Sequence, residues 1–156
     1  MNVIANGIIL LATICLMECI SWCIHKYLFH GPLWFIHKSH HQPKHSLLEW
    51  NDIFAIFFAG LSLYLMYIDR VANSYVFFIG VGISAYGCIY FVIHDWLIHQ
   101  RVRAFRIKNR YILKLRKAHK IHHKNLGREN GRAFGLLFIN QNVVVTDKTV
   151  KGNQKG

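Results

Sequence analysis

The chain has 156 residues, which is enough for one domain. It is 53% hydrophobic yet carries a formal net charge of +12, a combination that argues against an ordinary soluble globular protein. Almost all of the apolar residues precede residue 100, and most of the Lys and Arg residues follow it. This separation predicts an apolar part in a membrane and a basic part outside it, within a single domain over residues 1–156.

Three apolar stretches predict membrane-spanning helices, at about 3–23, 53–68 and 74–93. The second is shorter than the usual minimum of about 17 residues, and a buried core helix would explain that stretch alone. Three such stretches in so short a chain leave no soluble shell to cover them. A cleaved signal peptide is the alternative for the first, but no basic region precedes it and no small-x-small site ends it. We therefore predict an all-α integral membrane protein with about three to four transmembrane helices.

Ten of the eleven histidines form one spacing pattern that occurs twice. Each copy has two histidines separated by four residues, followed by His-x2-His-His. Histidines scattered through a core do not repeat their own spacing, and imidazole is the commonest side-chain metal ligand. Two sets of five predict two metal ions in one all-nitrogen cage. The ten residues are His25, His30, His37, His40, His41, His94, His99, His119, His122 and His123.

The spacing within each copy constrains the local backbone. The His-x2-His-His unit places its rings at i, i+3 and i+4, on one face of a helix. Two residues five apart point about 140° away from each other on an ideal α-helix. The two rings of each pair separated by four residues can therefore meet only at a helix end, through a distortion of the helix, or by bridging two metals. Gly31-Pro32 supplies a helix end after His30, whereas His94 and His99 have no comparable break, so their geometry stays open.

The distribution of positive charge predicts the topology. Only Arg70 of the 19 Lys and Arg residues lies in the turn between the second and third predicted spans. Positive residues favour the cytoplasmic side, so the N-terminus is expected outside and the basic region inside. Two crossings separate the two histidine-rich segments, 25–45 and 94–123. Both should emerge on the cytoplasmic face, where they could form one di-metal cap; residues 141–156 are expected to be a loosely held tail.

The donor set favours one kind of metal chemistry. Zinc takes four ligands in structural sites and three in catalytic ones, so ten imidazoles are too many for one zinc ion. Two six-coordinate ions with five nitrogens each would keep roughly one open position apiece, as iron sites for O2 activation do. We therefore expect two iron ions that attack an unactivated C–H bond of a lipid-dissolved substrate, with zinc as a substitute in purified protein. A metal store or transporter is the alternative, although transporters place ligands near the bilayer midplane.

Such a reaction needs two electrons from outside the chain, because no flavin, haem or nicotinamide motif is present. A separate donor protein should dock on the cytoplasmic side. The run 101–124 is rich in Lys and Arg and contains no acidic residue. It could attract an acidic partner or, equally, anionic headgroups of the membrane lipids. We expect no nucleic-acid partner.

Several polar residues are candidates for supporting the cage. Asp95 adjoins His94 and is either a hydrogen-bond partner that fixes a ligand tautomer or a helix-surface charge. Glu49 and Asp52 precede the second span, where acids suit a helix N-terminus, and could also support ligands. His45 is either such a partner or merely interfacial. Glu18 lies within the first span, where an ionisable residue indicates function unless it is packed against a neighbouring helix.

Five segments together resemble the bacterial β-carotene hydroxylases of the membrane fatty acid hydroxylase superfamily. They are HKYLFHG at 25–31, HKSHHQP at 37–43, EWND at 49–52, YFVIHDWLIHQR at 90–101 and AHKIHHK at 118–124. The resemblance runs from about residue 25 to residue 138. The EWND block and the HDWLIHQR segment favour the carotenoid branch over fatty-acyl or sterol hydroxylases and desaturases, which share the histidine motifs.

The resemblance implies a non-haem di-iron monooxygenase that hydroxylates carbon 3 of β-ionone rings, from β-carotene through β-cryptoxanthin to zeaxanthin. It implies the ten histidines above as ligands, ferredoxin and its reductase as electron donors, and a bacterial cytoplasmic membrane location with the site on the cytoplasmic side. Trp96 departs from the family pattern, which has a small residue after His-Asp. This departure could change the ring pocket. Another membrane-lipid hydroxylase or desaturase, or a non-enzymatic metal-binding membrane protein, remains the alternative.

Overall fold

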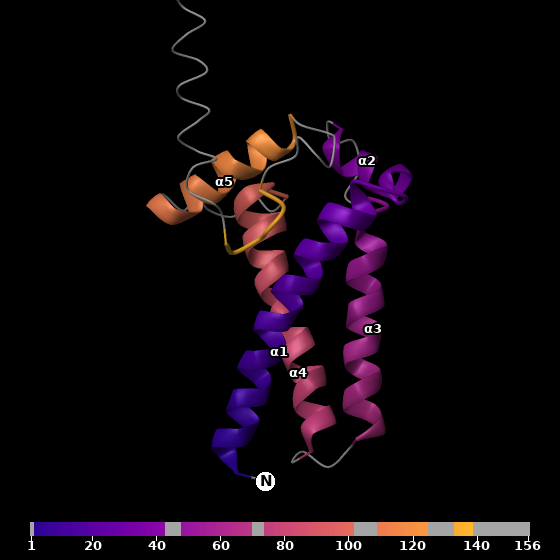
Figure 1. Cartoon of the computed structure of the whole chain (residues 1–156), viewed down its shortest axis with the longest axis vertical. Coiled ribbons are helices and arrows are strands. Elements are labelled where there is room, and N and C mark those ends of the chain that lie inside the picture. Colours follow the sequence, from indigo (N-terminus) through magenta and orange to yellow (C-terminus); the bar gives the residue numbers. More distant parts are fainter. Residues whose placement is uncertain (1, 43–47, 70–73, 102–108, 125–132, 139–156) are drawn as a thin grey trace, which may run out of the picture.

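Three long apolar helices run side by side and carry shorter helical segments at one end (Figure 1). The computed structural model describes residues 2–42, 48–69, 74–101, 109–124 and 133–138. The three long helices are α1 (Val3–Cys23), α3 (Asp52–Ile68) and α4 (Tyr75–Tyr90). The shorter segments are η1 (Ile24–Phe29), α2 (Trp34–His41), η2 (Phe91–Ile98) and α5 (Arg110–His122). Within these ranges every regular element is helical, which confirms the predicted fold class.

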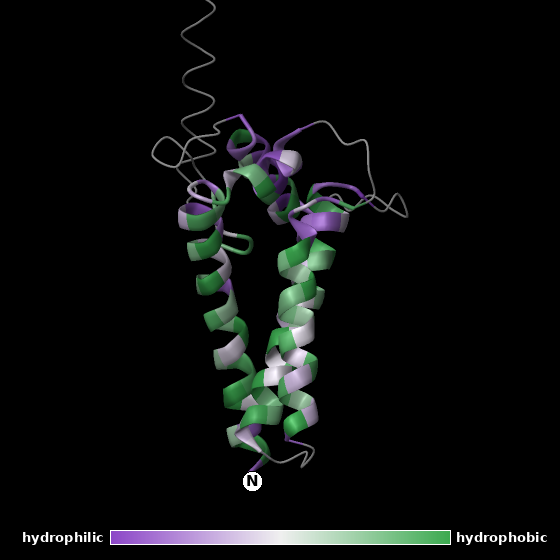
Figure 2. Ribbon diagram, turned by 90° about the vertical axis from the view of Figure 1, so that its right-hand side faces the viewer, coloured by the Kyte–Doolittle hydropathy of each residue, from purple (hydrophilic) through white to green (hydrophobic). Residues whose placement is uncertain are grey.

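The outer surface of the long helices is apolar, as Figure 2 shows by colour. Val3 is 84% exposed, Ile56 68% and Leu63 65%. A helix that is apolar all round is not stable against water, so this surface indicates contact with lipid. Val3–Phe29 and Tyr75–Ile98 are each long and apolar enough to cross a membrane, whereas α3 is a shorter apolar helix. The three predicted spans are therefore helices, and the first and third continue beyond their predicted ends.

Helix α4 lies at the centre of the bundle and contacts both α1 and α3. Gly80 and Gly82 allow these close approaches, because small residues let membrane helices pack backbone to backbone. The Ser62 hydroxyl of α3 donates to the carbonyl of Gly80 at 2.9 Å. Met17, Ile83, Tyr86 and Leu136 form the buried apolar cluster, and Leu136 comes from the segment 133–138. The bundle thus includes a non-helical segment from late in the sequence.

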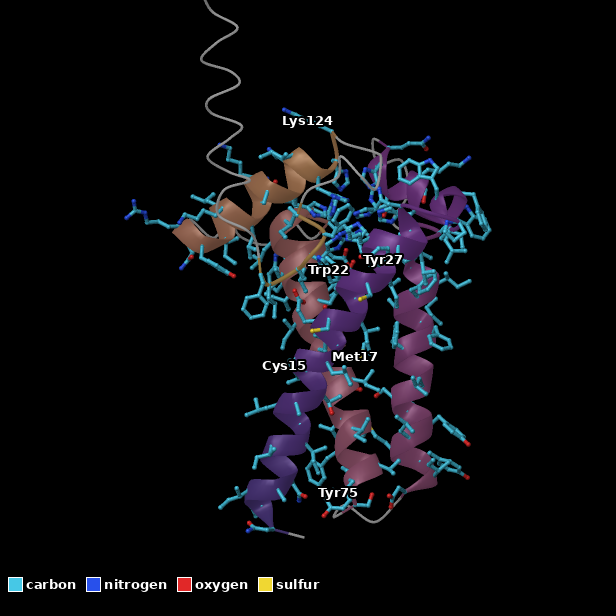
Figure 3. All side chains as sticks on the ribbon, in the orientation of Figure 1. Cys15, Met17, Trp22, Tyr27, Tyr75 and Lys124 are labelled. Carbon is cyan, nitrogen blue, oxygen red and sulfur yellow. The ribbon has the colours of Figure 1, made fainter. Side chains whose placement is uncertain are left out.

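Both histidine-rich segments lie at the same end of the bundle, as the count of two crossings predicted (Figure 1). In Figure 3, Tyr75 marks the end near the N-terminus, and Lys124 lies at the opposite end among the nitrogen-bearing side chains. Helix α5 carries His119 and His122, and His123 caps its C-terminus. His45, Arg70 and the predicted tail 141–156 lie outside the described residues.

The close contact of α1 with α4 gives a stability prediction. A Cβ atom at Gly82 would lie 2.6 Å from Thr13 Cβ, whereas a Cβ at Gly60 would meet nothing within 4 Å. Gly82→Ala should cost about 1–3 kcal/mol through overpacking. Gly60→Ala should be neutral or slightly stabilising, because Ala loses less backbone freedom in a helix. Thermal unfolding of the detergent-solubilised protein checks this, and equal unfolding temperatures for the two variants would contradict the packing of α1 on α4.

Candidate metal centre

Two π-helical segments bring together the rings of the histidine pairs that are separated by four residues. In a π-helix the backbone hydrogen bond joins residues five apart. The N–H of His30 donates to the carbonyl of His25 at 3.1 Å, and the N–H of His99 donates to that of His94 at 2.9 Å. The ring centroids are 5.3 Å apart in the first pair and 4.6 Å in the second. Of the three arrangements that the spacing allowed, the structure shows a distortion in both copies.

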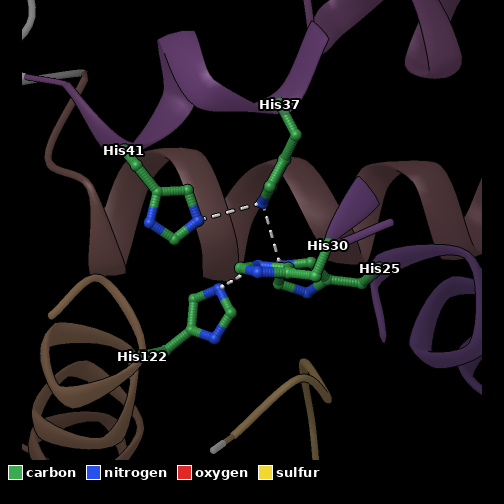
Figure 4. A group of neighbouring side chains, drawn as sticks. All are labelled: His25, His30, His37, His41 and His122. Carbon is green, nitrogen blue, oxygen red and sulfur yellow. Dashed lines mark hydrogen bonds between the residues drawn. The ribbon is translucent and has the colours of Figure 1, made fainter. Parts of the chain in front are cut away.

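The ten histidines form one cluster with two groups of converging nitrogens. Figure 4 shows the first group, in which rings from η1, α2 and α5 point toward one another. This first group is His25, His30, His37, His41 and His122. The second group is His40, His94, His99 and His119. His123 adjoins the second group, with its Nε2 atom 2.9 Å from Nε2 of His119.

Each group takes one histidine from the other copy of the sequence pattern. His40 of the first copy joins the second group, and His122 of the second copy joins the first. The reason is helical: successive residues differ by about 100° around the axis, so His40 points away from His41. The same holds for His122 and His123 on α5. The sequence predicted two sets of five, but not this exchange between them.

The hydrogen bonds of the outward-facing nitrogens decide where the imidazole lone pairs point. Nδ1 of His25 lies 2.9 Å from the Phe134 carbonyl oxygen, and Nδ1 of His37 lies 3.0 Å from Asn51 Oδ1. Both oxygens only accept, so both Nδ1 atoms carry the proton and both Nε2 atoms present lone pairs. These Nε2 atoms face each other at 3.1 Å. Two opposed lone pairs repel unless a cation lies between them, so the arrangement fits a metal ion.

In the second group, the hydrogen bond of His40 also leaves the Nε2 lone pair facing inward. Its Nδ1 atom donates to Glu49 Oε2 at 2.8 Å. Its Nε2 atom is buried and has no hydrogen-bond partner among the described residues. A buried unpaired acceptor costs about 1–3 kcal/mol, which coordination to a metal would offset.

Several pairs of ring nitrogens approach each other closely within each group. Nε2 of His41 is 3.1 Å from Nε2 of His37, and Nε2 of His30 is 3.2 Å from that of His122. Nε2 of His99 is 2.7 Å from Nε2 of His119. Donors to one ion at a metal–nitrogen distance of about 2.1 Å lie roughly 3.0–3.4 Å apart, so one ion could contact several nitrogens of each group.

The environment also keeps the imidazoles neutral, as metal ligands must be. Burial, reinforced by neighbouring imidazoles, lowers the pKa of His37 and of His41 to about 3. Burial and the rings of His94 and His99 hold the pKa values of His40 and His119 well below the usual range. Protonation near neutral pH therefore does not compete with metal binding.

Arg101 joins the acidic residues that support the second group. Its guanidinium lies 2.7 Å from Glu49, 3.1 Å from Asp52 and 3.6 Å from Asp95. Glu49 contacts His40, and Asp95 Oδ1 lies 3.0 Å from Nδ1 of His94. Burial lowers the pKa of Arg101. The carboxylates of Asp95, Glu49 and Asp52 raise it by more, so the pKa lies above its usual value. One half-buried cation thus balances the carboxylates that orient two histidines.

The structure places the predicted supporting residues at different distances from the cage. Glu49 and Asp95 contact histidines directly, whereas Asp52 accepts from the Glu49 backbone N–H at 2.9 Å and binds Arg101. The sequence analysis missed Asn51, Arg101 and the carbonyl of Phe134. Asn51 lies inside the EWND block and was detectable there. A backbone carbonyl leaves no side-chain signal.

An apolar cavity of about 590 Å³ lies between α1, α3 and α4 and reaches both histidine groups. His25 and His37 of the first group border it, as do His94 and His119 of the second. Its apolar walls include Phe54, Phe58, Ile83, Leu115 and Leu136. Trp96, which was expected to alter a ring pocket, is not among the described residues that line it. The cavity can hold a lipophilic molecule with one end at the metal centre.

Comparison with known proteins agrees with this geometry. A family model described as fatty acid hydroxylase matches residues 10–143. The chain belongs to the fatty acid hydroxylase family. Its family membership makes it a hydroxylase, an oxidoreductase, and confirms the resemblance seen in the sequence. No solved structure matches the chain.

Several curated relatives carry a more specific name. A protein named beta-carotene hydroxylase from Pantoea ananas is 40% identical over 134 residues, covering 85% of this chain and 77% of the relative. A Paracoccus sp. protein of the same name is 36% identical over 135 residues, covering 85% and 83%. Beta-carotene 3-hydroxylase 1, chloroplastic, of Arabidopsis thaliana is 35% identical over 119 residues, covering 73% and 38%.

The exchange of histidines gives a metal-binding prediction. His40→Ala and His122→Ala should each lower bound metal by roughly half, because each removes a donor from one group and leaves the other complete. Lys120→Ala, on the exposed side of α5, should keep the wild-type content. Elemental analysis of the purified protein checks this. If both histidine variants bind as much metal per chain as the wild type, His40 and His122 are not metal ligands.

The low pKa values predict that acid destabilises the folded protein. Unfolded histidines titrate near about 6.5, whereas His37 and His41 titrate at about 3 in the fold. Between these values the unfolded chain binds more protons, so stability is complete above about pH 6.5 and is lost as the pH falls toward 3. Unfolding temperatures of metal-free protein across this window check the sign. A His37→Gln/His41→Gln variant should show a flatter dependence; an unchanged slope would contradict the assignment.

Proposed function

We propose that the chain is a non-haem di-iron monooxygenase that hydroxylates carbon 3 of the β-ionone rings of carotenoids. The reaction would convert β-carotene through β-cryptoxanthin to zeaxanthin. The observation that carries this proposal is the apolar cavity that borders both histidine groups. The 35–40% identity to proteins named as β-carotene hydroxylases supports the substrate class.

Iron is the metal that best suits this donor set. When bound, two iron ions would activate O2 and supply the oxidant that an unactivated C–H bond requires. Five imidazoles converge in the first group and His123 adjoins the four of the second, which exceeds the four ligands that zinc usually takes; zinc remains a substitute in purified protein. The chain's own contribution is orientation. Glu49, Asn51 and the Phe134 carbonyl hold His40, His37 and His25 with Nε2 directed inward.

The cavity would position the substrate and exclude water. Phe54, Phe58 and Leu136 offer only apolar surface, so a hydrocarbon ring can enter without leaving a polar group unpaired. Because the cavity lies between the long apolar helices, a carotenoid could enter it directly from the bilayer. A storage or transport protein would have no need for an apolar chamber beside its metal ligands.

Ferredoxin and its reductase are the proposed source of the two electrons. Arg110, Lys120 and Lys124 are exposed on or next to α5, close to the histidine cluster in sequence. Their charge would attract an acidic donor protein, and anionic lipid headgroups are the competing occupant. The same excess of positive charge favours the cytoplasmic side of a bacterial cytoplasmic membrane for this face.

Expression in a bacterial host that accumulates β-carotene tests the proposal. The wild-type chain should yield β-cryptoxanthin and zeaxanthin on pigment chromatography, and His40→Ala should yield neither. Ala59→Trp, which fills the cavity wall away from the ligands, should keep bound metal but lower hydroxylation at least about tenfold.

Unchanged β-carotene despite a folded, iron-loaded protein would overturn the carotenoid assignment. New hydroxylated or desaturated fatty acyl or sterol products in the host lipids would show that the substrate is another membrane lipid. If the iron-loaded protein consumes no O2, the proposed monooxygenase activity is wrong.

A further inference from the structure

A buried carboxyl group within the first membrane span has no part in the reaction described above. Glu18 lies in α1 about two turns before His25, and it is only 6% exposed. Its Oε2 atom accepts a hydrogen bond from the Tyr86 hydroxyl at 2.9 Å. Its Oε1 atom accepts from the backbone N–H of Leu136 at 3.0 Å and of Leu137 at 2.8 Å. All three donors come from parts of the chain that are distant in sequence.

The segment 133–138 needs such a partner because of where it lies. It is non-helical, yet Leu136 is buried in the apolar cluster with Met17, Ile83 and Tyr86. Unpaired backbone N–H groups in an apolar surrounding cost several kcal/mol each, so irregular backbone survives there only when the protein satisfies it. Glu18 satisfies two successive N–H groups at once. It therefore determines how the segment lies against α1 and α4.

The same segment reaches the first histidine group. The Phe134 carbonyl accepts the Nδ1 proton of His25 at 2.9 Å. The Phe134 ring packs against His25, His30 and His122 with centroid distances of 5.5, 5.2 and 5.2 Å. Any displacement of the segment thus moves the group that fixes the His25 tautomer.

Two features show that this backbone path is tightly constrained. Ala133 has φ 61°, in the left-handed region that residues other than glycine rarely adopt. A Cβ atom at Gly135 would lie 2.7 Å from the Phe138 carbonyl oxygen and 3.5 Å from Oε1 of Glu18. Strained backbone of this kind persists only where surrounding contacts hold it. The hydrogen bonds to Glu18 are the polar contacts that hold it on the α1 side.

We propose that Glu18 is a positioning residue that, by fixing Leu136 and Leu137, holds the Phe134 carbonyl against His25 and so maintains the first histidine group. The role rests on the proposed function only in that it takes the histidine groups as metal ligands. The alternative is that Glu18 contributes to the stability of the bundle and to nothing else. Metal retention separates the two, because it depends on the orientation of His25 in protein that is already folded.

The experiment titrates folded, metal-loaded protein with a chelator and measures the metal that remains per chain. Loss of an outer hydrogen-bond partner of a ligating histidine typically lowers metal affinity about 10–100-fold. Glu18→Ala should therefore release one of the two ions at about 10–100-fold lower chelator concentration, and the other at the wild-type concentration. Glu18→Gln should lie close to wild type, because its amide oxygen can still accept from both backbone N–H groups.

Two further variants separate positioning from stability. Gly135→Ala displaces the segment while Glu18 is intact and should release the same ion early. The double variant Glu18→Ala/Gly135→Ala should lose no more than the worse single variant, because both changes act through one segment. Ser62→Ala removes a fully buried hydrogen bond between α3 and α4 and serves as the matched control. It should lower the unfolding temperature and leave both metal transitions unchanged.

Wild-type metal retention in folded Glu18→Ala protein would overturn the proposal, as would equal early loss of both ions. If Glu18→Ala does not fold, wild-type retention in Gly135→Ala would overturn it in the same way. No carotenoid is present in this assay, so the result stands apart from the test for zeaxanthin. A chain that hydroxylates no carotenoid would still show whether Glu18 holds His25.

Discussion

Ten imidazole rings that bind metal ions together must each be neutral and turn a lone pair toward an ion. For three of the rings, the structure meets this condition with acceptors placed on the outside of the cluster. The Phe134 carbonyl, Asn51 and Glu49 each take the Nδ1 proton of one ring and leave its Nε2 atom facing inward. Burial holds the pKa values of His37 and His40 below the usual range, so these two rings stay neutral. The inward lone pairs would repel one another without cations between them, so the arrangement favours metal binding.

The three long apolar helices position the histidine cluster. Helix α4 packs against α1 and α3 through small residues, and its π-helical extension η2 brings His94, and His99 directly after it, to the end of the bundle. Helix α1 does the same through η1. The π-helices turn residues five apart onto one side, so each long helix delivers a pair of rings rather than one. The cavity lies between the three long helices and borders both histidine groups, so an apolar molecule inside it would lie beside the polar ligands.

Much of this architecture could be predicted from the sequence because its causes are local. Hydropathy located the three long helices, and two crossings placed both histidine segments on one face. The five-residue spacing left a helix end, a distortion and a bridging position open, and it did not distinguish them. The exchange of His40 and His122 could not be predicted, because spacing along one helix does not say which neighbouring helix each ring will meet. The course of the segment 133–138 could not be predicted, since its main contacts are backbone groups. Glu18 gave a clear signal, an acid in an apolar span, but its partners lie 68 to 119 residues away.

The exchange of one histidine between the two copies also bears on the order of events during biosynthesis. The first group has four of its five rings once residue 41 has left the ribosome, but it lacks His122 until nearly the whole chain has been made. The second group likewise combines His40 with rings from η2 and α5. Neither half of the polypeptide can therefore assemble a complete set of donors by itself. Either group can therefore be completed only after all three long helices have been synthesised, because His119 and His122 follow them in the chain.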